Sequence, residues 1–115
     1  MATNAEAFRR LALSLPEAEE QDHRGHPSFR VGEKIFATLW PDEHRAVLKL
    51  RLEDQADLLS ASPKVFSLNA WSKQGWTNMD LEQITVPECR ELLEQAWRIV
   101  APKKLVRLHD EDKTA

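Results

Sequence analysis

Residues 26–52 contain the pattern that most restricts the fold of this chain, because they divide into three short apolar runs separated by two tight turns. The last run is the most regular, since every second position of residues 45–52 is apolar: Ala46, Leu48, Leu50 and Leu52. Successive side chains of a β-strand point to opposite faces, so this period predicts a strand whose leucines face a core. The whole stretch predicts three sequential antiparallel strands.

Two amphipathic helices are expected to flank these strands. In residues 4–15 apolar side chains recur at helical spacing after Asn4, a residue typical of helix N-caps. Residues 85–100 begin with Thr85 and Glu88 at the spacing of a capping box and continue with a second apolar stripe. The patterns therefore predict one helix before the strands and one after them.

The other segments predict less regular elements. We expect an edge strand or loop at residues 17–24, a short helix at 53–61 capped by Asp54, an irregular region at 64–73 and a further strand at 76–81.

This order of elements predicts an α+β fold, in which an antiparallel sheet of about four to five strands packs against an N-terminal helix, a C-terminal helix and short helices. A chain of 115 residues has the usual size of one domain. We expect a single domain over residues 1–115, with its core at about residues 4–104 and a polar, frayed tail at 105–115.

Composition limits where the protein acts and what it binds. The sequence contains no membrane-length apolar run and no signal-peptide core, and its single cysteine cannot close an intramolecular disulfide. We therefore expect a monomeric cytoplasmic protein without membrane contact. The net charge of −3 repels polyanions as a whole, so nucleic-acid binding would require cations gathered on one face.

Few residue combinations suggest catalysis. His23 and His26, with Glu20 and Asp22 beside them, have the donor types of a metal site, but such a group without a cysteine pair or a third fixed ligand is commonly structural. Cys89 lies at a helix start, which favours the thiolate, and on an apolar stripe, which favours a buried, inert thiol. The 3 glycines are scattered, so no phosphate loop is expected. We expect no enzyme, metal or cofactor, with an ion held by His23, His26 and Glu20 as the alternative.

The polar face of the expected sheet is the candidate binding surface. If its leucines point inward, basic side chains project from the opposite face or its rim, and we predict contacts with nucleic acid at Arg30, Lys34, Arg45, Lys49, Arg51 and Lys73. Aromatic side chains are expected on the same face: Phe36, Trp40 and Trp76. Cations interleaved with aromatic rings can hold phosphates and stack on bases. An ordinary solvated face and a groove for a peptide or small ligand are the alternatives.

The segment order also resembles a known family. The motifs LALSLPEAEE, GHPSFRVGEKIFATL, LKLRL, SPKVF, GWTNMDL and ELLEQAWRIVAPKK, in this order over about residues 5–105, resemble the MmcQ/YjbR family of small bacterial proteins. The resemblance implies an α+β double-wing fold, similar to frataxin-like folds, and a DNA-binding label that derives from similarity of shape. It implies neither catalytic residues nor a cofactor. The expected partner is DNA, with a protein or small ligand as the alternative.

Overall fold

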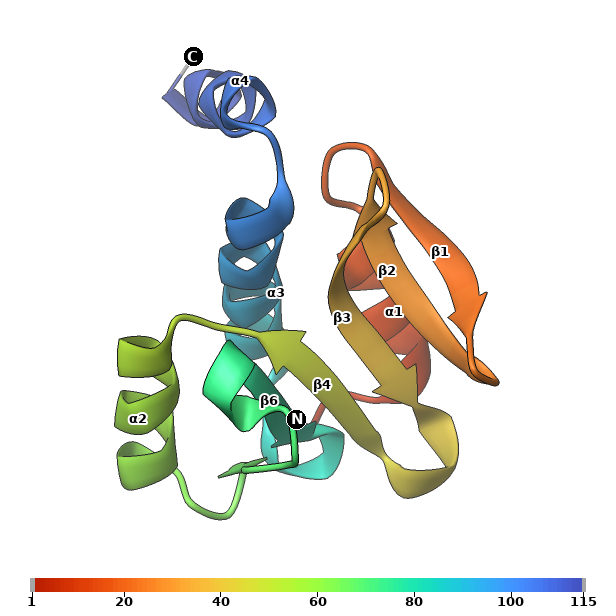
Figure 1. The fold of residues 1–115 in the computed structure, drawn as a ribbon, viewed down its shortest axis with the longest axis vertical. Helices are drawn as coiled ribbons and strands as arrows, with labels where there is room; N and C mark the ends of the chain where they lie inside the picture. The colour runs from red at the N-terminus through yellow and green to blue at the C-terminus, as the bar shows by residue number, and fades with distance from the viewer. Residues whose placement is uncertain (1, 115) are drawn as a thin grey trace.

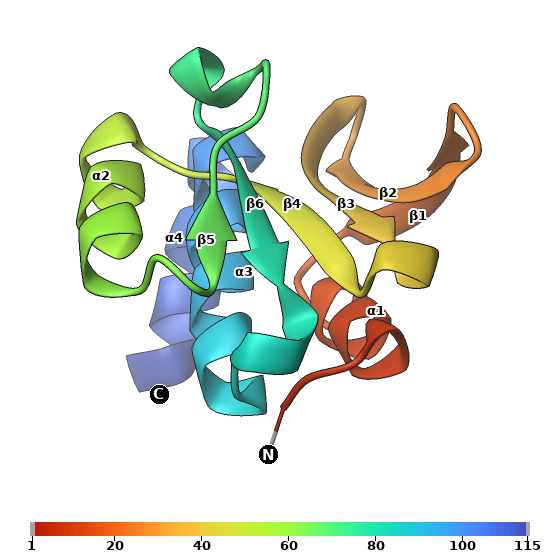
Figure 2. The same cartoon turned by 90° about the horizontal axis from the view of Figure 1, so that it is seen from below.

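Six strands form one antiparallel sheet in the computed structural model, which describes residues 2–114 and the side chains of residues 2–112. The strand order is β1-β2-β3-β4-β6-β5 (Figure 1 and Figure 2). The strands are β1 (Ala18–His23), β2 (His26–Val31), β3 (Lys34–Trp40), β4 (Arg45–Lys49), β5 (Phe66–Ser67) and β6 (Trp76–Asp80). The expected fold class is confirmed, with slightly more strands than expected, because residues 17–24 form an edge strand and β5 lies within the segment expected to be irregular.

The helices α1 and α3 pack against one face of this sheet, and the opposite face stays open (Figure 2). The helices within residues 2–114 are α1 (Ala5–Leu13), α2 (Leu52–Ala61), α3 (Val86–Val100) and α4 (Lys103–Thr114). The same part of the chain contains three short 3-10 helices next to strands: η1 (Pro41–Glu43), η2 (Ser72–Gln74) and η3 (Leu81–Gln83). None of these helices is long and apolar enough to cross a membrane.

The core lies between the sheet and the helices α1 and α3. Its largest side chains are fully buried and come from both layers: Phe8, Phe29, Phe36, Leu48, Met79, Leu93 and Trp97. Ala46 and Leu48 of β4 face inward as their period predicts, while the alternate side chains of this strand face the open side. Each such apolar side chain contributes roughly 1.5–3 kcal/mol when it leaves water.

The expected helix starts at Asn4 and Thr85 are confirmed. The Asn4 side chain accepts a hydrogen bond from the Ala7 amide at 2.8 Å. Thr85 and Glu88 form the expected capping box. These caps satisfy amides that the first helical turn leaves without partners.

The strand expected at residues 45–52 is shorter than its pattern suggests. The strand β4 ends at Lys49, and Arg51, in extended conformation, is the N-cap of α2. Asp54 therefore lies in the first helical turn and is not the cap. Leu52 is 54% exposed and does not face the core. The backbone turns before the alternation ends, so the period alone overestimates the strand.

A β-bulge in β3 moves Phe36 away from the open face. Phe29 pairs with Ala37 and Arg30 pairs with Ile35, so Phe36 is an extra residue in the strand. Phe36 and Ala37 both lie in the core, whereas Ile35 points to the open face. The expectation that Phe36 belongs to the aromatic face is wrong, because it assumed regular alternation across the bulge.

The segment expected to be a frayed tail is helical as far as Thr114. Leu105 and Val106 pack against the core. His109 lies 2.7 Å from a Glu94 carboxylate oxygen, and its ring meets the edge of Trp97 at 5.0 Å between centroids. Helix α4 is therefore docked on α3 through both apolar and charged contacts.

Candidate functional site

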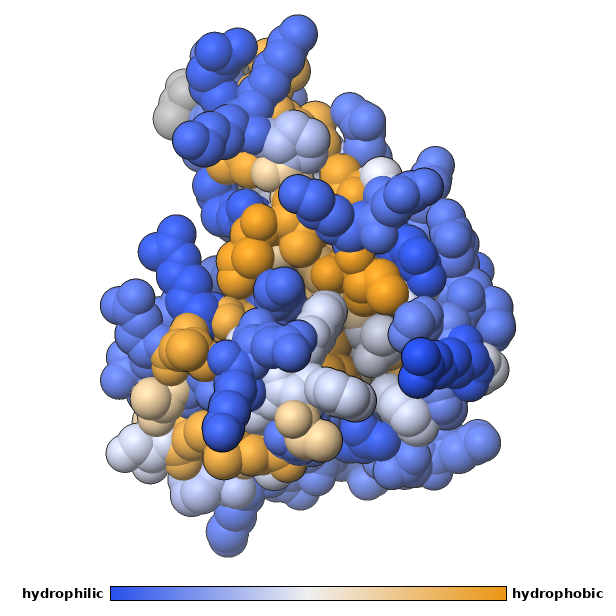
Figure 3. Space-filling view, in the orientation of Figure 1, coloured by the Kyte–Doolittle hydropathy of each residue, from blue (hydrophilic) through white to orange (hydrophobic). Residues whose placement is uncertain are grey.

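A groove of about 750 Å³ occupies the open face of the sheet. Its floor consists of β3 and β4, while the β1–β2 turn and the β5–β6 connection rise from the sheet on the same side (Figure 2). Apolar and weakly polar side chains are exposed near the middle of the face drawn in Figure 3, and hydrophilic side chains surround them. Pockets that bind small molecules have volumes in this range, roughly 300–1,000 Å³.

The floor pairs aromatic and cationic side chains by strand register. Trp40 of β3 lies opposite Arg45 of β4, and the Arg45 guanidinium carbon is 4.4 Å from the centroid of the Trp40 ring. Arg45 also donates to both carboxylate oxygens of Glu43 at 3.2 Å and to Asn78 Oδ1 at 3.3 Å. Its charge is therefore largely balanced within the protein.

The wall at the β1–β2 turn presents His23, Arg24 and His26 to the groove. His26 stacks on Trp40 with ring centroids 3.4 Å apart and an interplanar angle of 30°. Arg24 has φ 53° and Gly25 has φ 87°, the backbone of a two-residue hairpin turn. A non-glycine residue in this left-handed region costs about 1–2 kcal/mol. The turn therefore holds Arg24 in a backbone conformation that arginine disfavours.

The opposite wall presents Trp71, Gln74 and Trp76. Trp71 is 62% exposed, the highest exposure among the large hydrophobic side chains of the described residues. The Trp71 amide donates to Asn69 Oδ1 at 2.8 Å, and the Asn69 amide donates to Ser72 Oγ at 2.8 Å. Local hydrogen bonds thus fix the backbone at Trp71, whose indole ring is largely exposed to solvent.

Gln55 of α2 anchors this wall from behind. Gln55 is 7% exposed, and its amide nitrogen donates to the Ser72 carbonyl at 3.1 Å and to Thr77 Oγ1 at 2.9 Å. The same nitrogen also lies 3.3 Å from the Trp76 carbonyl oxygen, so one buried amide links α2 to several groups of this wall, and losing it would remove a buried donor from them. The pattern of residues 53–61 did not mark Gln55, because its role depends on a loop about twenty residues away.

Gly75 allows the wall to lie directly on the sheet. It has φ 99°, and a Cβ atom at this position would lie 2.3 Å from the Leu50 carbonyl oxygen. The Leu50 amide in turn donates to the Gly75 carbonyl at 2.9 Å. Only glycine fits both this conformation and this approach.

The groove lining is free of carboxylates, although the protein is acidic overall. It contains Arg24 and Arg45, and no aspartate or glutamate is among the described residues that line it. The whole sequence contains 19 acidic residues against 16 lysines and arginines. The side chains that line the groove therefore carry positive charge and no negative charge, unlike the acidic chain as a whole.

Only some of the predicted site residues lie in this groove. Arg45, Trp40 and Trp76 line it, and Lys49 Nζ lies 5.3 Å from the Trp76 ring centroid. Arg51 lines a separate hollow beside Asp54 and Arg98.

The remaining predicted cations do not join the groove either. Arg30 donates to Ser28 Oγ at 3.1 Å and lies opposite Glu19 on the neighbouring strand. Lys34 and Lys73 are exposed outside the groove lining. The predicted basic face is therefore dispersed.

Sequence reasoning missed four residues that line the groove: Arg24, Asn69, Trp71 and Gln74. The signal for Arg24 was the pair Arg24-Gly25 between two strand-like runs, which is the length of a hairpin turn. The groove itself had no local signal in the sequence, because its two sides come together only through long-range contacts.

The titratable candidates do not assemble a reactive group. His23 lines the groove, whereas the Glu20 carboxylate pairs with Arg9 of α1 on the opposite face of the sheet. In residues 2–112 no three histidine, cysteine or carboxylate side chains are placed to hold a metal ion. Burial raises the pKa of the Cys89 thiol from 9.0 to about 12, and a hydrogen bond with Thr3 offsets this only in part. Cys89 is therefore a neutral core thiol at physiological pH.

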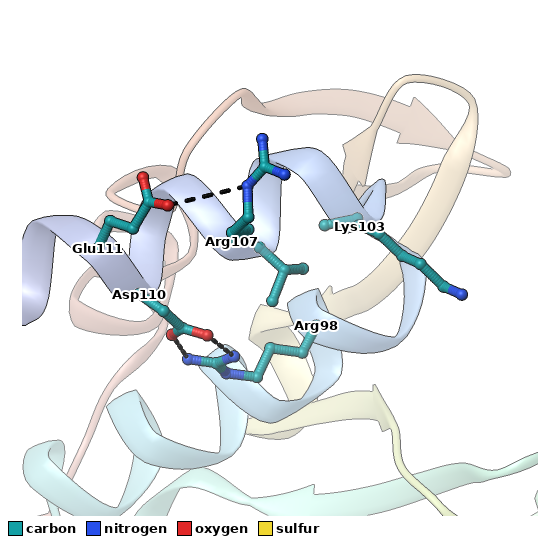
Figure 4. Close-up of a pocket in the computed structure, with 7 residues that line it drawn as sticks. Arg98, Lys103, Arg107, Asp110 and Glu111 are labelled. Atoms are coloured by element: carbon teal, nitrogen blue, oxygen red, sulfur yellow. Dashed lines mark hydrogen bonds and ion pairs between the residues drawn. The ribbon is translucent and has the colours of Figure 1, made fainter.

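A second hollow of about 530 Å³ lies where α3 meets α4 (Figure 4). Arg98 donates to both carboxylate oxygens of Asp110, and Arg107 lies 3.9 Å from Glu111. The bond to Asp110 raises the pKa of Arg98 above its ordinary value. These charges balance one another, so the hollow is better explained by the docking of α4 than by a ligand.

Comparisons with known proteins identify a family and a similar solved structure. The YjbR family model matches residues 13–99 of this chain. The crystal structure of the Deinococcus radiodurans protein DR2400, with a DUF419 domain, aligns with a TM-score of 0.78 and 20% sequence identity, over 90% of this chain and 82% of that chain. No curated protein sequence matches. At this identity the likeness to the solved structure concerns the fold.

Proposed function

The chain belongs to the YjbR family, as its motifs predicted, and from the groove on its sheet we propose that it is a non-enzymatic binding module for a small ligand or peptide. The observation that supports this most is the concentration of aromatic rings in one hollow. Three of the four tryptophans of the sequence line the groove, and the fourth, Trp97, is buried in the core.

The exposure of Trp71 is the physical argument for a ligand. Removing an exposed indole from water is favourable, and aromatic anchors of this kind dominate binding energy at many recognition sites. The hydrogen bonds beneath Trp71 and the Gln55 anchor hold its loop in one conformation. A ring on a preformed wall loses little conformational entropy on binding.

Binding of DNA through the sheet is the second candidate. The pairs of Arg45 with Trp40 and of Lys49 with Trp76 favour it, since cations beside aromatic rings suit contacts with single strands. The dispersion of Arg30, Arg51 and the exposed lysines disfavours it, because duplex binding depends on neutralising several phosphates at once. We therefore place it after the aromatic groove.

A screen of aromatic fragments by ligand-observed NMR tests the proposal. We expect hits whose binding is lost in Trp71→Ala and changes little between low and high salt, because ring burial depends weakly on ionic strength. Leu68→Ala is the matched control, since Leu68 is an exposed apolar residue of the same connection that does not line the groove. Equal loss of the hits in both variants, or no hits at all, would contradict a ligand site at this wall.

A further inference from the structure

Arg24 gives the groove a chemical preference that the aromatic rings alone do not. We infer that the ligand joins a flat aromatic ring to an anionic group, with the ring against the tryptophans and the anion at Arg24. This inference rests on the proposed function and names the class of ligand for the same groove.

The first support concerns the ion-pair partners of Arg24. The structure gives it no ion pair with a carboxylate of the described residues, although acidic side chains are abundant on the surface. Asp22, two residues earlier, accepts a hydrogen bond from the Gly25 amide at Oδ2, 3.3 Å away, and forms no ion pair with Arg24. Arg45, by contrast, is held by Glu43. Of the two arginines in the lining, Arg24 is the one available to an incoming anion.

The second support is where the β1–β2 turn places this side chain. The hairpin turn keeps Arg24 in the left-handed backbone region, where asparagine, aspartate or glycine is usual. His26, immediately after the turn, stacks on Trp40 and ties the wall to the groove floor. Arg24 thus lines the same groove as a stacked aromatic pair, and the planar fork of donors of a guanidinium suits carboxylate or phosphate oxygens.

The third support is the electrostatic contrast of the groove with the rest of the chain. The lining includes two arginines and none of the carboxylates of the described residues, in a protein of net charge −3. Anions are attracted to such a concave site and repelled by the surrounding surface. Arg24 would repel a cationic ligand, and a purely apolar ligand would gain nothing from Arg24.

Calorimetric titration with two matched pairs of probes tests the inference. Adenosine 5′-monophosphate is compared with adenosine, and indole-3-acetate with indole-3-acetamide, so that each pair differs mainly in the anion. We expect the anion of at least one pair to bind about tenfold tighter than its neutral partner at low salt, the size of one hydrogen bond to a charged group. A preference confined to one pair distinguishes phosphate from carboxylate.

Variants of Arg24 assign the effect to this residue. Arg24→Gln should remove the difference within each pair and leave the neutral probes unchanged, and Arg24→Lys should restore part of it. Arg90→Gln, at an exposed position of α3, is the control and should change nothing. The inference is overturned if neither anion is preferred, or if Arg24→Gln keeps the preference. If the neutral rings still bind and Trp71→Ala abolishes their binding, the groove function survives that failure; if no ring compound binds, both are contradicted.

Discussion

Single residues with unusual backbone conformations or surroundings determine the shape of the groove. Gly75 permits the close approach of the β5–β6 connection to the sheet, and Arg24 adopts a conformation that favours residues with smaller or absent side chains. Such positions tend to coincide with functional sites, because only selection for a site maintains a local cost. The sequence predicted neither the turn at Arg24 nor the contact that Gly75 makes.

Gly75→Ala tests the close approach. The new Cβ would meet the Leu50 carbonyl, whereas a Cβ at Gly32, which also has positive φ, would meet nothing within 4 Å. We expect Gly75→Ala to lower the free energy of unfolding by at least about 2 kcal/mol, and Gly32→Ala to have only the smaller backbone penalty. Urea denaturation measures both. Equal losses would show that the wall does not need glycine for packing.

Cys89 predicts a pH dependence of stability. The folded state keeps the thiol proton up to a pKa of about 12, whereas the unfolded state releases it near 9.0. The stabilisation is therefore complete below pH 9 and is lost as pH rises through this window, by at most about 1.4 kcal/mol per unit. Comparing denaturation of the wild type and Cys89→Ala between pH 8 and 11 isolates this contribution, since other groups titrate equally in both. Parallel curves would contradict it.

At the level of elements, the amphipathic helices and the strands 45–52 and 76–81 were predictable because their side-chain periods are local properties. The capping signals at Asn4 and Thr85 also belong to single turns and are confirmed. The bulge at Phe36, the early end of β4 and the helix α4 were not predicted, since the local side-chain period does not contain the contacts between elements on which they depend. The groove shares this property, because its walls meet only in the folded sheet.

Gln55 gives the element-scale prediction. Gln55→Leu keeps the approximate side-chain size and removes the donor to Ser72 and Thr77, so we expect a loss of roughly 1–3 kcal/mol. We also expect the substitution to speed amide hydrogen exchange at residues 72–77, relative to the wild type, more than in the rest of the sheet. Ser60→Leu, at an exposed position of α2, is the control. Unchanged exchange in this segment would mean that Gln55 does not anchor the wall.

For the whole molecule, the distribution of charge decides between the two candidate functions. The net charge of −3 and the separation of the predicted cations into different surroundings leave no broad basic face in the described part of the chain. The sequence period predicted correctly that Arg45 and Lys49 share the open face, but it gave no information on Glu43 or Glu19 beside them. Counting cations along a strand omitted the carboxylates that the fold brings to them.

Duplex DNA binding should accordingly be weak. We expect no retardation of a short duplex at physiological salt in an electrophoretic mobility assay, and no change on combining Lys49→Glu with Arg51→Glu. Tight binding that falls steeply with salt, and that this double variant abolishes, would restore the nucleic-acid hypothesis.

The four indole N–H signals in a ¹⁵N–¹H NMR spectrum test the central claim most directly, because the tryptophans divide into three that line the groove and one that is buried. Trp97, whose Nε1 donates to the Pro16 carbonyl at 3.0 Å, is the internal control. On titration with an aromatic ligand from the screen, we predict saturable shifts of the Trp40, Trp71 and Trp76 signals, while the Trp97 signal stays in place. Binding that leaves the three groove indoles unmoved would contradict the account.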